Sequence, residues 1–327
     1  MKTRVLVTGG AGYIGSKIAY DLTDRDYKVY ILDNLSTGYK SLINKKAKFF
    51  KGSISDFKLV DSILKKNNIK NIIHLAASLD VGESESKPLK YYKNNVEGTR
   101  VLLEAAVKNK IRSFIFSSTC AVYGNSKNKK IKESDSCQPT SFYGKTKHLA
   151  ELLIKDFSKV FNFSYGILRY FNVVGSDSRL RTGLKKDNDQ LFNNLTKCYS
   201  NKNSSFYIYG KNYKTIDGTG VRDYISVSDL SKIHILTLEK LINENKSLIL
   251  NCGYGKGYSV LSIVKFFEKI LRKKINIKYK KKRRGDIEEI YSDNYLLKKT
   301  FKIKIFTSIS DIINSHLNWA IFRKKLR

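Results

Sequence analysis

The chain has 327 residues, which is enough for two domains or for one large α/β unit with a buried core. Hydrophobic residues make up 41% of it, which excludes global disorder, and two prolines exclude a collagen-like or proline-rich protein. The 62 Lys and Arg residues exceed the 29 Asp and Glu residues, giving a net charge of +33. Such an excess can indicate nucleic acid or a membrane as a partner, but here the basic residues run through the whole chain. We interpret them as a lysine-rich surface and expect neither partner.

The four cysteines and four histidines lack the spacing of a disulfide framework or a metal site. We therefore expect reduced thiols, a cytoplasmic location and no metal. Gly9 and Gly10 interrupt the first apolar run, so no signal peptide is expected. No stretch reaches the roughly 20 apolar residues of a membrane span.

The first half of the chain alternates short apolar runs with helical patterns. Strands are predicted at Arg4–Thr8, Lys28–Asp33, Phe49–Gly52, Asn71–Ala76, Ser113–Ser118 and Ser164–Tyr170, and helices at Ile14–Thr23, Phe57–Lys66, Tyr91–Lys108 and Phe142–Phe157. This alternation is typical of βαβ units, so the predicted fold is α/β, a Rossmann-like doubly wound parallel sheet. Irregular loops at Gly175–Asn188 and Lys211–Gly220 follow. We expect a Rossmann domain at residues 1–171 and a smaller α/β substrate-binding lobe at residues 172–327, with some segments returning to the sheet.

A glycine-rich loop follows the first predicted strand. Gly9, Gly12 and Gly15 form a G-x-x-G-x-x-G run at the start of a helix. Glycines there allow a tight turn, a close approach to a pyrophosphate and close packing of helix on strand, and the helix N-terminus favours phosphate. Asp33 ends the next strand, where a carboxylate can bind the adenosine ribose hydroxyls and would repel a 2′-phosphate. The sequence therefore predicts NAD rather than NADP as the cofactor.

A tyrosine and a lysine four residues apart form the candidate catalytic pair. Tyr143 and Lys147 fall on one face of a predicted helix. A free tyrosine has a pKa of about 10, and a nearby ammonium or an oxidised nicotinamide favours its phenolate. Ser117, Ser118 and Thr119 lie at the end of a strand, at the edge where a parallel sheet presents its active crevice. The pair is thus interpreted as the proton acceptor for a sugar hydroxyl.

Several segments together resemble the extended short-chain dehydrogenase/reductases, and among them the UDP-glucose 4-epimerases. They are Val7–Ser16, Leu32–Gly38, Val81–Thr99, Phe116–Gly124, Tyr143–Lys147, Leu168–Gly175 and Asp217–Leu230. The resemblance covers nearly the whole chain. It implies NAD-dependent epimerisation of UDP-hexoses at C4, of UDP-glucose and UDP-galactose and also of their N-acetyl forms, through a transient 4-keto sugar. It also implies a homodimer formed by the helices at Tyr91–Lys108 and Phe142–Phe157.

The resemblance further assigns residues by position. Tyr143 is the catalytic acid and base, Lys147 tunes it and binds the nicotinamide ribose, and Thr119 helps to hold the sugar hydroxyl. The cofactor-binding residues are Gly9, Gly12, Tyr13, Ile14, Gly15, Asp33, Asn34, Leu35, Ser36, Thr37, Gly38, Ile54, Leu75, Ala76, Ala77, Asn94, Lys147 and Phe171. The sugar-nucleotide contacts are Thr119, Tyr143, Asn172, Asn194, Leu195, Tyr207, Ile208, Tyr209, Arg222, Arg283, Asp286 and Ile290.

Some positions depart from the family pattern. Ser53 replaces a common Asp that binds the adenine amino group, Leu79 replaces a Lys that some members have near the cofactor, and Arg284 replaces a common Pro. Ile290 stands where a Tyr in some members narrows the pocket near the C2 substituent of the sugar. The absence of that ring predicts some activity on UDP-N-acetylglucosamine.

Three alternative functions differ in what they require. A 4,6-dehydratase typically has Asp-Glu after the threonine, whereas Cys120 and Ala121 stand here, so this function is disfavoured. A 4-epimerase of another nucleotide sugar, such as UDP-glucuronate, would keep the same catalytic residues. A catalytically idle NAD-binding or nucleic-acid-binding protein would not need the intact Thr119, Tyr143 and Lys147.

Overall fold

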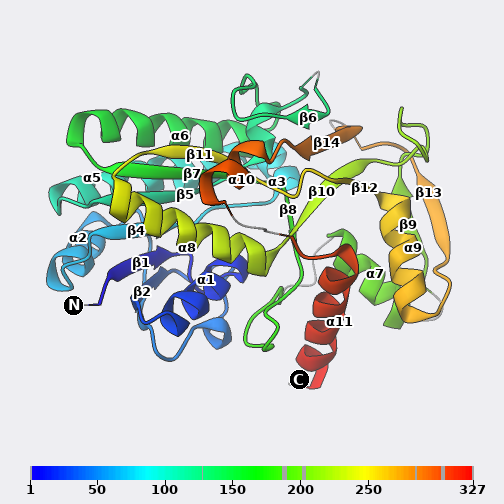
Figure 1. Ribbon diagram of the computed structural model, residues 1–327, viewed down its shortest axis with the longest axis horizontal. Coiled ribbons are helices and arrows are strands. Elements are labelled where there is room, and N and C mark those ends of the chain that lie inside the picture. The colour runs from blue at the N-terminus through cyan, green and yellow to red at the C-terminus, as the bar shows by residue number, and fades with distance from the viewer. Residues whose placement is uncertain are drawn as a thin grey trace. The chain divides into compact units, whose positions relative to one another are not determined.

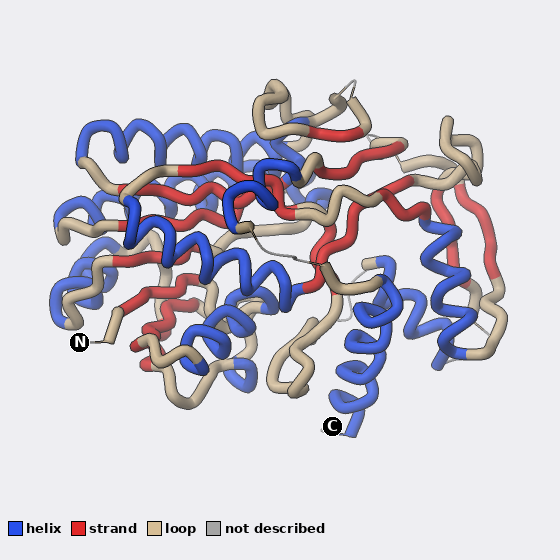
Figure 2. Tube along the Cα trace, viewed as in Figure 1, coloured by secondary structure: helices blue, strands red, loops and turns tan. Residues whose placement is uncertain are grey.

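The computed structural model describes residues 2–126, 128–185, 190–200, 204–283, 286–302 and 306–325 (Figures 1 and 2). The chain divides into two compact units. Unit 1 comprises Met1–Asn125, Glu133–Tyr170 and Ser231–Asn251, and unit 2 comprises Ser126–Lys132, Phe171–Leu230 and Cys252–Arg327. The predicted domain boundary at residue 171 stays a prediction.

The large sheet consists of β1 (Arg4–Thr8), β2 (Lys28–Asp33), β3 (Lys48–Lys51), β4 (Asn71–His74), β5 (Ser113–Thr119), β7 (Ser164–Tyr170) and β11 (Leu248–Cys252). Their order is β11-β7-β5-β4-β1-β2-β3, and the strands from β3 to β7 pair in parallel. This order places the first strand in the middle and reverses direction beside it, as in doubly wound folds. The predicted fold class is therefore confirmed.

Helices cover both faces of this sheet (Figure 1). The helices of unit 1 are α1 (Tyr13–Asp24), α2 (Phe57–Lys66), α3 (Val81–Ser86), α4 (Pro88–Tyr91), α5 (Gly98–Lys108), α6 (Phe142–Phe161) and most of α8 (Val227–Glu244), with short turns η1 (Lys40–Leu42), η2 (Tyr92–Glu97) and η3 (Cys120–Tyr123). Val60 of α2, Leu102 of α5 and Ile154 of α6 share one apolar cluster with Leu6 and Phe114 of the sheet. Helices α1 and α8 lie on the other face.

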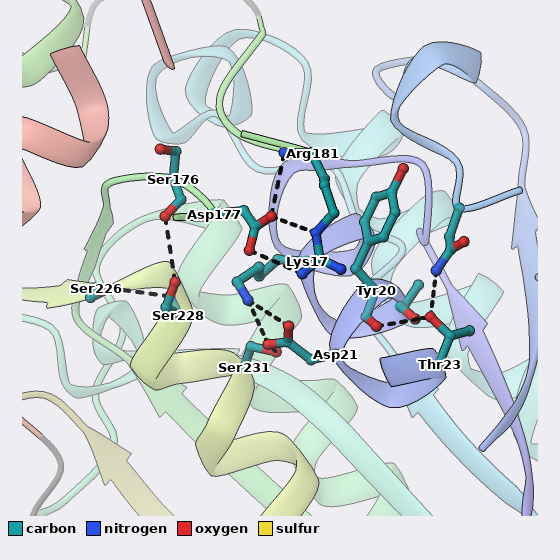
Figure 3. Close-up of polar contacts among 12 residues, drawn as sticks. Lys17, Tyr20, Asp21, Thr23, Ser176, Asp177, Arg181, Ser226, Ser228 and Ser231 are labelled. Atoms are coloured by element: carbon teal, nitrogen blue, oxygen red, sulfur yellow. Dashed lines mark hydrogen bonds and ion pairs between the residues drawn. The ribbon is translucent and has the colours of Figure 1, made fainter. Parts of the chain in front are cut away.

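Helix α8 comes late in the sequence but is tied firmly to the first helix. Lys17 Nζ lies 2.5 Å from Asp21 Oδ1, and the Ser231 hydroxyl donates to Asp21 Oδ2 at 2.7 Å (Figure 3). A Cβ on Gly166 of β7 would lie only 2.5 Å from the Thr237 side chain, so glycine there permits the close approach of α8 to the sheet. The late segment therefore contacts α1 and β7 and belongs to unit 1.

The structure differs from the predicted elements at several ends. The chain is helical over the predicted range Tyr91–Lys108 and includes a π-helical turn at η2, in which the buried Asn95 side chain bonds Ser78 and Thr146. Strand β4 ends at His74, and β5 includes Thr119. Helix α6 continues to Phe161, where Asn162 takes the left-handed conformation that ends it.

Unit 2 contains a mixed sheet and a separate strand pair. Its strands are β6 (Lys130–Ile131), β8 (Asn172–Val174), β9 (Phe206–Tyr209), β10 (Val221–Ser226), β12 (Gly257–Ser259), β13 (Ile277–Lys280) and β14 (Glu289–Ser292). Its helices are α7 (Leu191–Ser200), α9 (Val260–Leu271), α10 (Tyr295–Phe301) and α11 (Ile309–Lys325). The order is β12-β10-β14-β6 with β8 beside β10, while β9 pairs with β13.

Two features hold unit 2 together. The Phe192 ring packs against Tyr224, Phe267 and His316, with ring centroids 5.4 to 5.7 Å apart. The fully buried Asp223 carboxylate accepts hydrogen bonds from the backbone of Tyr254 and from both the backbone and the hydroxyl of Ser292. In the part of the chain that the structure describes, no helix is long and apolar enough to cross a membrane.

Candidate functional site

The glycine-rich loop joins β1 to α1 and has the geometry of a phosphate cradle. Gly9 has a φ of +73°, and a Cβ there would lie 2.7 Å from the backbone nitrogen of Ala76. A Cβ on Gly15 would lie 2.3 Å from the Gly9 carbonyl oxygen. Helix α1, all of which is described, begins at Tyr13 after the N-cap residue Gly12, with no side-chain cap hydrogen bond and no acidic residue in its first turn. Its positive end thus suits an anionic ligand such as a pyrophosphate.

The Asp33 carboxylate is held against this loop. It ends β2 and is 7% exposed. One oxygen accepts from the Ala11 backbone N–H at 2.9 Å and the other from the Leu35 backbone N–H at 2.8 Å. These bonds orient the carboxylate beside the glycine-rich loop, where it can bind ribose hydroxyls and would repel a 2′-phosphate.

The other predicted cofactor residues of unit 1 follow the carboxyl ends of neighbouring strands. Asn34–Gly38 follow β2, Ile54 follows β3, Leu75–Ala77 follow β4, and Asn94 lies in η2. In parallel sheets this is the edge where nucleotides bind, so these residues and the glycine-rich loop fit a dinucleotide. The two departures also lie here: Ser53 is half-buried, and Leu79 is 60% exposed. Phe171 belongs to unit 2 and is buried.

The predicted catalytic residues come together at the end of β5 and the start of α6. The Thr119 hydroxyl bonds the Tyr143 phenol, which lowers the pKa of Tyr143, but burial is the larger effect and raises that pKa to about 12. The Lys147 side chain lies over the Phe116 ring, with Nζ 4.5 Å from its centroid, and is 2% exposed. Burial lowers the pKa of Lys147 to about 7, against the opposing charge of Glu151.

These pKa values limit what the pair can do alone. Burial favours the neutral phenol of Tyr143 by raising its pKa, and it disfavours the ammonium of Lys147 by lowering its pKa. The lysine by itself is thus a weaker source of positive charge than its sequence position suggests. An oxidised nicotinamide near Tyr143 would add the positive charge that favours the phenolate.

The residues assigned to the sugar nucleotide lie mostly in unit 2. Arg222 of β10 lies beside Asp286, with Nη2 3.4 Å from Oδ1, and the Arg283 guanidinium lies 3.9 Å from the Tyr209 ring centroid. Arg284 and Gly285 lie outside the described residues. Both described guanidiniums keep contacts with solvent. They provide the charge and the forked donors that suit a diphosphate.

The remaining members of this set divide by exposure. Asn172 and Tyr207 are exposed, and Asn194 and Tyr209 are half-buried. The apolar members Leu195, Ile208 and Ile290 are between 0% and 3% exposed. Ile290 lies on β14, paired in register with Arg222 of β10. The contact of these apolar residues with a sugar nucleotide stays a prediction.

Two buried charged residues of unit 1, Glu151 and Arg169, were missed by the sequence analysis. The Arg169 guanidinium donates from Nε and Nη2 to the two oxygens of Glu151 at 3.0 and 2.7 Å. The Ser118 hydroxyl donates to the same carboxylate at 2.5 Å. Two features of the sequence could have indicated this ion pair. Arg169 stands inside an apolar strand, and Glu151 follows Lys147 by one helical turn.

Glu151 also belongs to a cluster with metal-ligand atoms. Atoms of Cys137, His148 and Glu151 lie within 4.8 Å of one another. Both carboxylate oxygens of Glu151 already accept from Arg169, whose positive charge opposes a cation. The expectation of no metal stays a prediction.

The comparisons with known proteins agree on one family. Residues 5–253 match the model of the NAD dependent epimerase/dehydratase family. The UDP-glucose 4-epimerase of Bacillus subtilis is 38% identical over 301 residues, 88% of each chain. The structure of a UDP-glucose 4-epimerase from Stenotrophomonas maltophila with NAD and formylated UDP-arabinopyranose superposes with a TM-score of 0.96, at 30% identity over 99% of this chain and 100% of that one. The UDP-Glc/GlcNAc 4-epimerase of Campylobacter jejuni gives a TM-score of 0.85, at 33% identity over 99% of both chains.

Proposed function

Since the chain belongs to the NAD dependent epimerase/dehydratase family, and within it to the UDP-glucose 4-epimerases, we propose that it interconverts UDP-glucose and UDP-galactose with NAD. The family, the enzyme class and the cofactor predicted from the sequence are confirmed by these relatives. The observation that carries the proposal is the bonded pair of Thr119 and Tyr143, with Lys147 on the same helix.

The glycine-rich loop and Asp33 would hold the dinucleotide through its pyrophosphate and adenosine ribose. When bound, NAD supplies the chemistry of accepting a hydride from C4 and returning it. Tyr143 takes the proton of the C4 hydroxyl as C4 loses its hydride, which leaves a 4-keto sugar. After the sugar has turned over, Tyr143 returns the proton as C4 regains the hydride on its opposite face.

Two further residues assist this proton transfer. The Thr119 hydroxyl bonds Tyr143 and lowers its pKa, so it offsets part of the effect of burial. Lys147 would bind the nicotinamide ribose and, when protonated, favour the phenolate of Tyr143. In unit 2, Arg222 and Arg283 would bind the diphosphate of the substrate.

A product assay tests the proposal directly. Purified protein is incubated with UDP-glucose, UDP-galactose, their N-acetyl forms and UDP-glucuronate, and products are separated by chromatography. We expect the first two to interconvert, and denatured protein to release NAD. Turnover of UDP-glucuronate alone would instead support a uronate 4-epimerase, and release of NADP would contradict the assigned cofactor.

We also propose a cytoplasmic homodimer that uses α5 and α6. Helix α6 exposes Leu149, Leu152, Val160 and Phe161, by 38% to 72%. A pocket beside them is lined in part by Val107 of α5 and Phe57 of α2. Exposed apolar patches of this kind support self-association. Light scattering is expected to give a dimer for the native chain and a monomer for Leu152→Glu, whereas a native monomer would refute the proposal.

A further inference from the structure

An ion pair that is almost fully buried joins the catalytic helix to two strands of the large sheet. Glu151 of α6 is 0% exposed, and the side chain of Arg169 of β7 is 3% exposed. The Ser118 hydroxyl of β5 completes the set by donating to Glu151. A buried charge of this kind is stable only when it is paired and fully hydrogen-bonded, so the pair fixes three elements in one arrangement.

The arrangement extends to the far edge of the sheet. Arg169 Nη1 donates to the Tyr123 hydroxyl at 2.9 Å, and that hydroxyl donates to Asn251 Oδ1 of β11 at 2.7 Å. The Arg169 guanidinium also lies 4.9 Å from the Tyr123 ring centroid. Because these contacts use the arginine on several sides, Glu151 is held in a single position.

Glu151 and its partner Ser118 each lie close in sequence to a predicted catalytic residue. Its partner Ser118 directly precedes Thr119 on β5. Glu151 itself follows Lys147 by one turn of α6. We propose that Glu151 is a positioning residue of the proton transfer, which holds Thr119 and Lys147 in a fixed relation to Tyr143.

The charge of Glu151 gives it a second effect. Burial lowers the pKa of Lys147, and Glu151 raises it. His74 also interacts with Lys147, but burial lowers the pKa of His74 to about 3, so this imidazole is neutral. The other acidic groups of the packed helices have partners of their own: Glu83 bonds Lys90, Glu85 bonds the Phe142 backbone, and Glu97 and Glu104 pair with Arg100. The packed elements contain these further titratable or charged groups: Tyr91, Tyr92, Lys93, Lys108, Cys120, Tyr123, Tyr165, Arg169 and Tyr170.

The first test measures the charge of Lys147 without a sugar substrate. NAD-loaded protein labelled with ¹⁵N-lysine is titrated by NMR, with Lys147 assigned from Lys147→Arg. Glu151→Gln is expected to lower the midpoint by about one pH unit, because removing a nearby opposite charge disfavours the ammonium. The matched control is Glu104→Gln, which opens an exposed pair with Arg100 on α5 and leaves the midpoint unchanged. An unchanged midpoint in Glu151→Gln overturns the proposal.

The second test separates positioning from folding. Glu151→Gln is expected to lower kcat about tenfold per NAD-loaded chain, with KM within about twofold of the native value. Since Lys147 then loses its proton at a lower pH, the alkaline limb of the kcat profile moves to lower pH. A purely structural residue would lower the unfolding temperature and the yield but leave kcat per loaded chain and its pH profile unchanged.

A charge-neutral variant keeps the tests decisive if the single variant unfolds. Glu151→Gln leaves Arg169 as an unpaired buried cation, which is strongly destabilising. Glu151→Gln/Arg169→Met removes both charges. Lowered kcat with unchanged KM in this variant supports the proposal, and native kcat overturns it. The inference rests on the proposed epimerase function. The titration midpoint of Lys147 is measured without a UDP-sugar, so it can be determined even if the native protein is inactive. Inactivity of the native protein would refute the proposed function but not the effect of Glu151 on Lys147.

Discussion

Arg169 in unit 1 and Arg222 in unit 2 are the same residue type in opposite environments. The Arg169 side chain is 3% exposed and donates twice to the fully buried Glu151. The Arg222 side chain is 20% exposed, and its ion pair with Asp286 has a long contact of 3.4 Å between partners that both reach solvent. The first arginine is saturated by the protein, whereas the second keeps donors that a diphosphate can use.

The difference shows how burial divides structural from binding charges. A buried and saturated ion pair resists any change of partner, because an exchanged partner would leave a charge without solvation. A half-exposed pair contributes little to stability, so a ligand can replace its acidic partner at low cost. Under the proposed function, unit 1 uses charge to fix the elements that carry Thr119, Tyr143 and Lys147, whereas the exposed charge of Arg222 in unit 2 would bind the substrate.

The largest effect is expected from the proton acceptor itself. Tyr143→Phe keeps the ring and removes the hydroxyl that bonds Thr119. We expect kcat to fall by about 10²- to 10⁴-fold, the usual contribution of a positioned acid or base. UDP-glucose affinity, measured by calorimetry, should change little. Near-native turnover in this variant would show that Tyr143 is not the proton acceptor. It would also contradict the proposed role of unit 1 in catalysis.

The next effect is on stability and concerns the buried arginine. Arg169→Met leaves the Glu151 carboxylate buried without its main partner. We expect the free energy of unfolding to fall by about 3 to 5 kcal/mol, as for other broken buried ion pairs. Urea unfolding measures it, with Arg222→Met as the matched control that should lose less than about 1 kcal/mol. Equal losses in the two variants would contradict the distinction between the two arginines.

The sequence analysis succeeded where the determinants are local. The alternation of apolar runs correctly predicted the parallel sheet. The glycine-rich loop and Asp33 lie together after β1 and β2, at the edge where the sequence predicts a nucleotide. The helix predicted at Tyr91–Lys108 is confirmed, but its π-helical turn was not predicted. Asn95 in that turn bonds Ser78 and Thr146, which lie far from it in sequence. No local pattern contains those contacts.

The buried charges were also beyond reach of the sequence. Whether Glu151 meets Arg169 depends on the β5–β7 register and on how α6 packs over these strands. The pKa of Lys147 likewise depends on its burial over Phe116, which spacing along a helix does not reveal. Burial depends on how the whole sheet and its helices assemble. The spacing of Tyr143 and Lys147 along a helix therefore predicts that they lie close together, but it does not predict their pKa values.

A smaller effect is expected on the binding side. Arg222→Ala removes one guanidinium from the proposed diphosphate contact, and charged hydrogen bonds contribute about 1.5 to 3 kcal/mol. We therefore expect the Kd for UDP to rise about 10- to 100-fold, with kcat at saturating substrate near native. Isothermal titration with UDP, followed by kinetics, checks both values. A loss of kcat with unchanged affinity would place Arg222 in the chemistry instead.

The smallest effect concerns the choice between sugars. The resemblance places Ile290 near the C2 substituent, where a Tyr would narrow the pocket, so the native chain is expected to act on UDP-N-acetylglucosamine as well as UDP-glucose. Ile290→Tyr should lower the ratio of kcat/KM for the N-acetyl substrate to that for UDP-glucose by about tenfold, the scale of a steric clash in a pocket. A native chain inert toward the N-acetyl substrate, or an unchanged ratio in the variant, would contradict the assignment.

The position of Ile290 makes its controls important. It is 3% exposed on β14, opposite Arg222 of β10, so a larger ring must displace neighbours at a cost of about 1 to 3 kcal/mol in stability. Such a displacement could also move Arg222 and weaken binding of both sugars. The ratio of kcat/KM for the two substrates is not affected by a loss that both share, because both substrates carry the same diphosphate. Ile290→Leu keeps the volume and should keep the native ratio, which leaves the added ring as the cause of any change in selectivity.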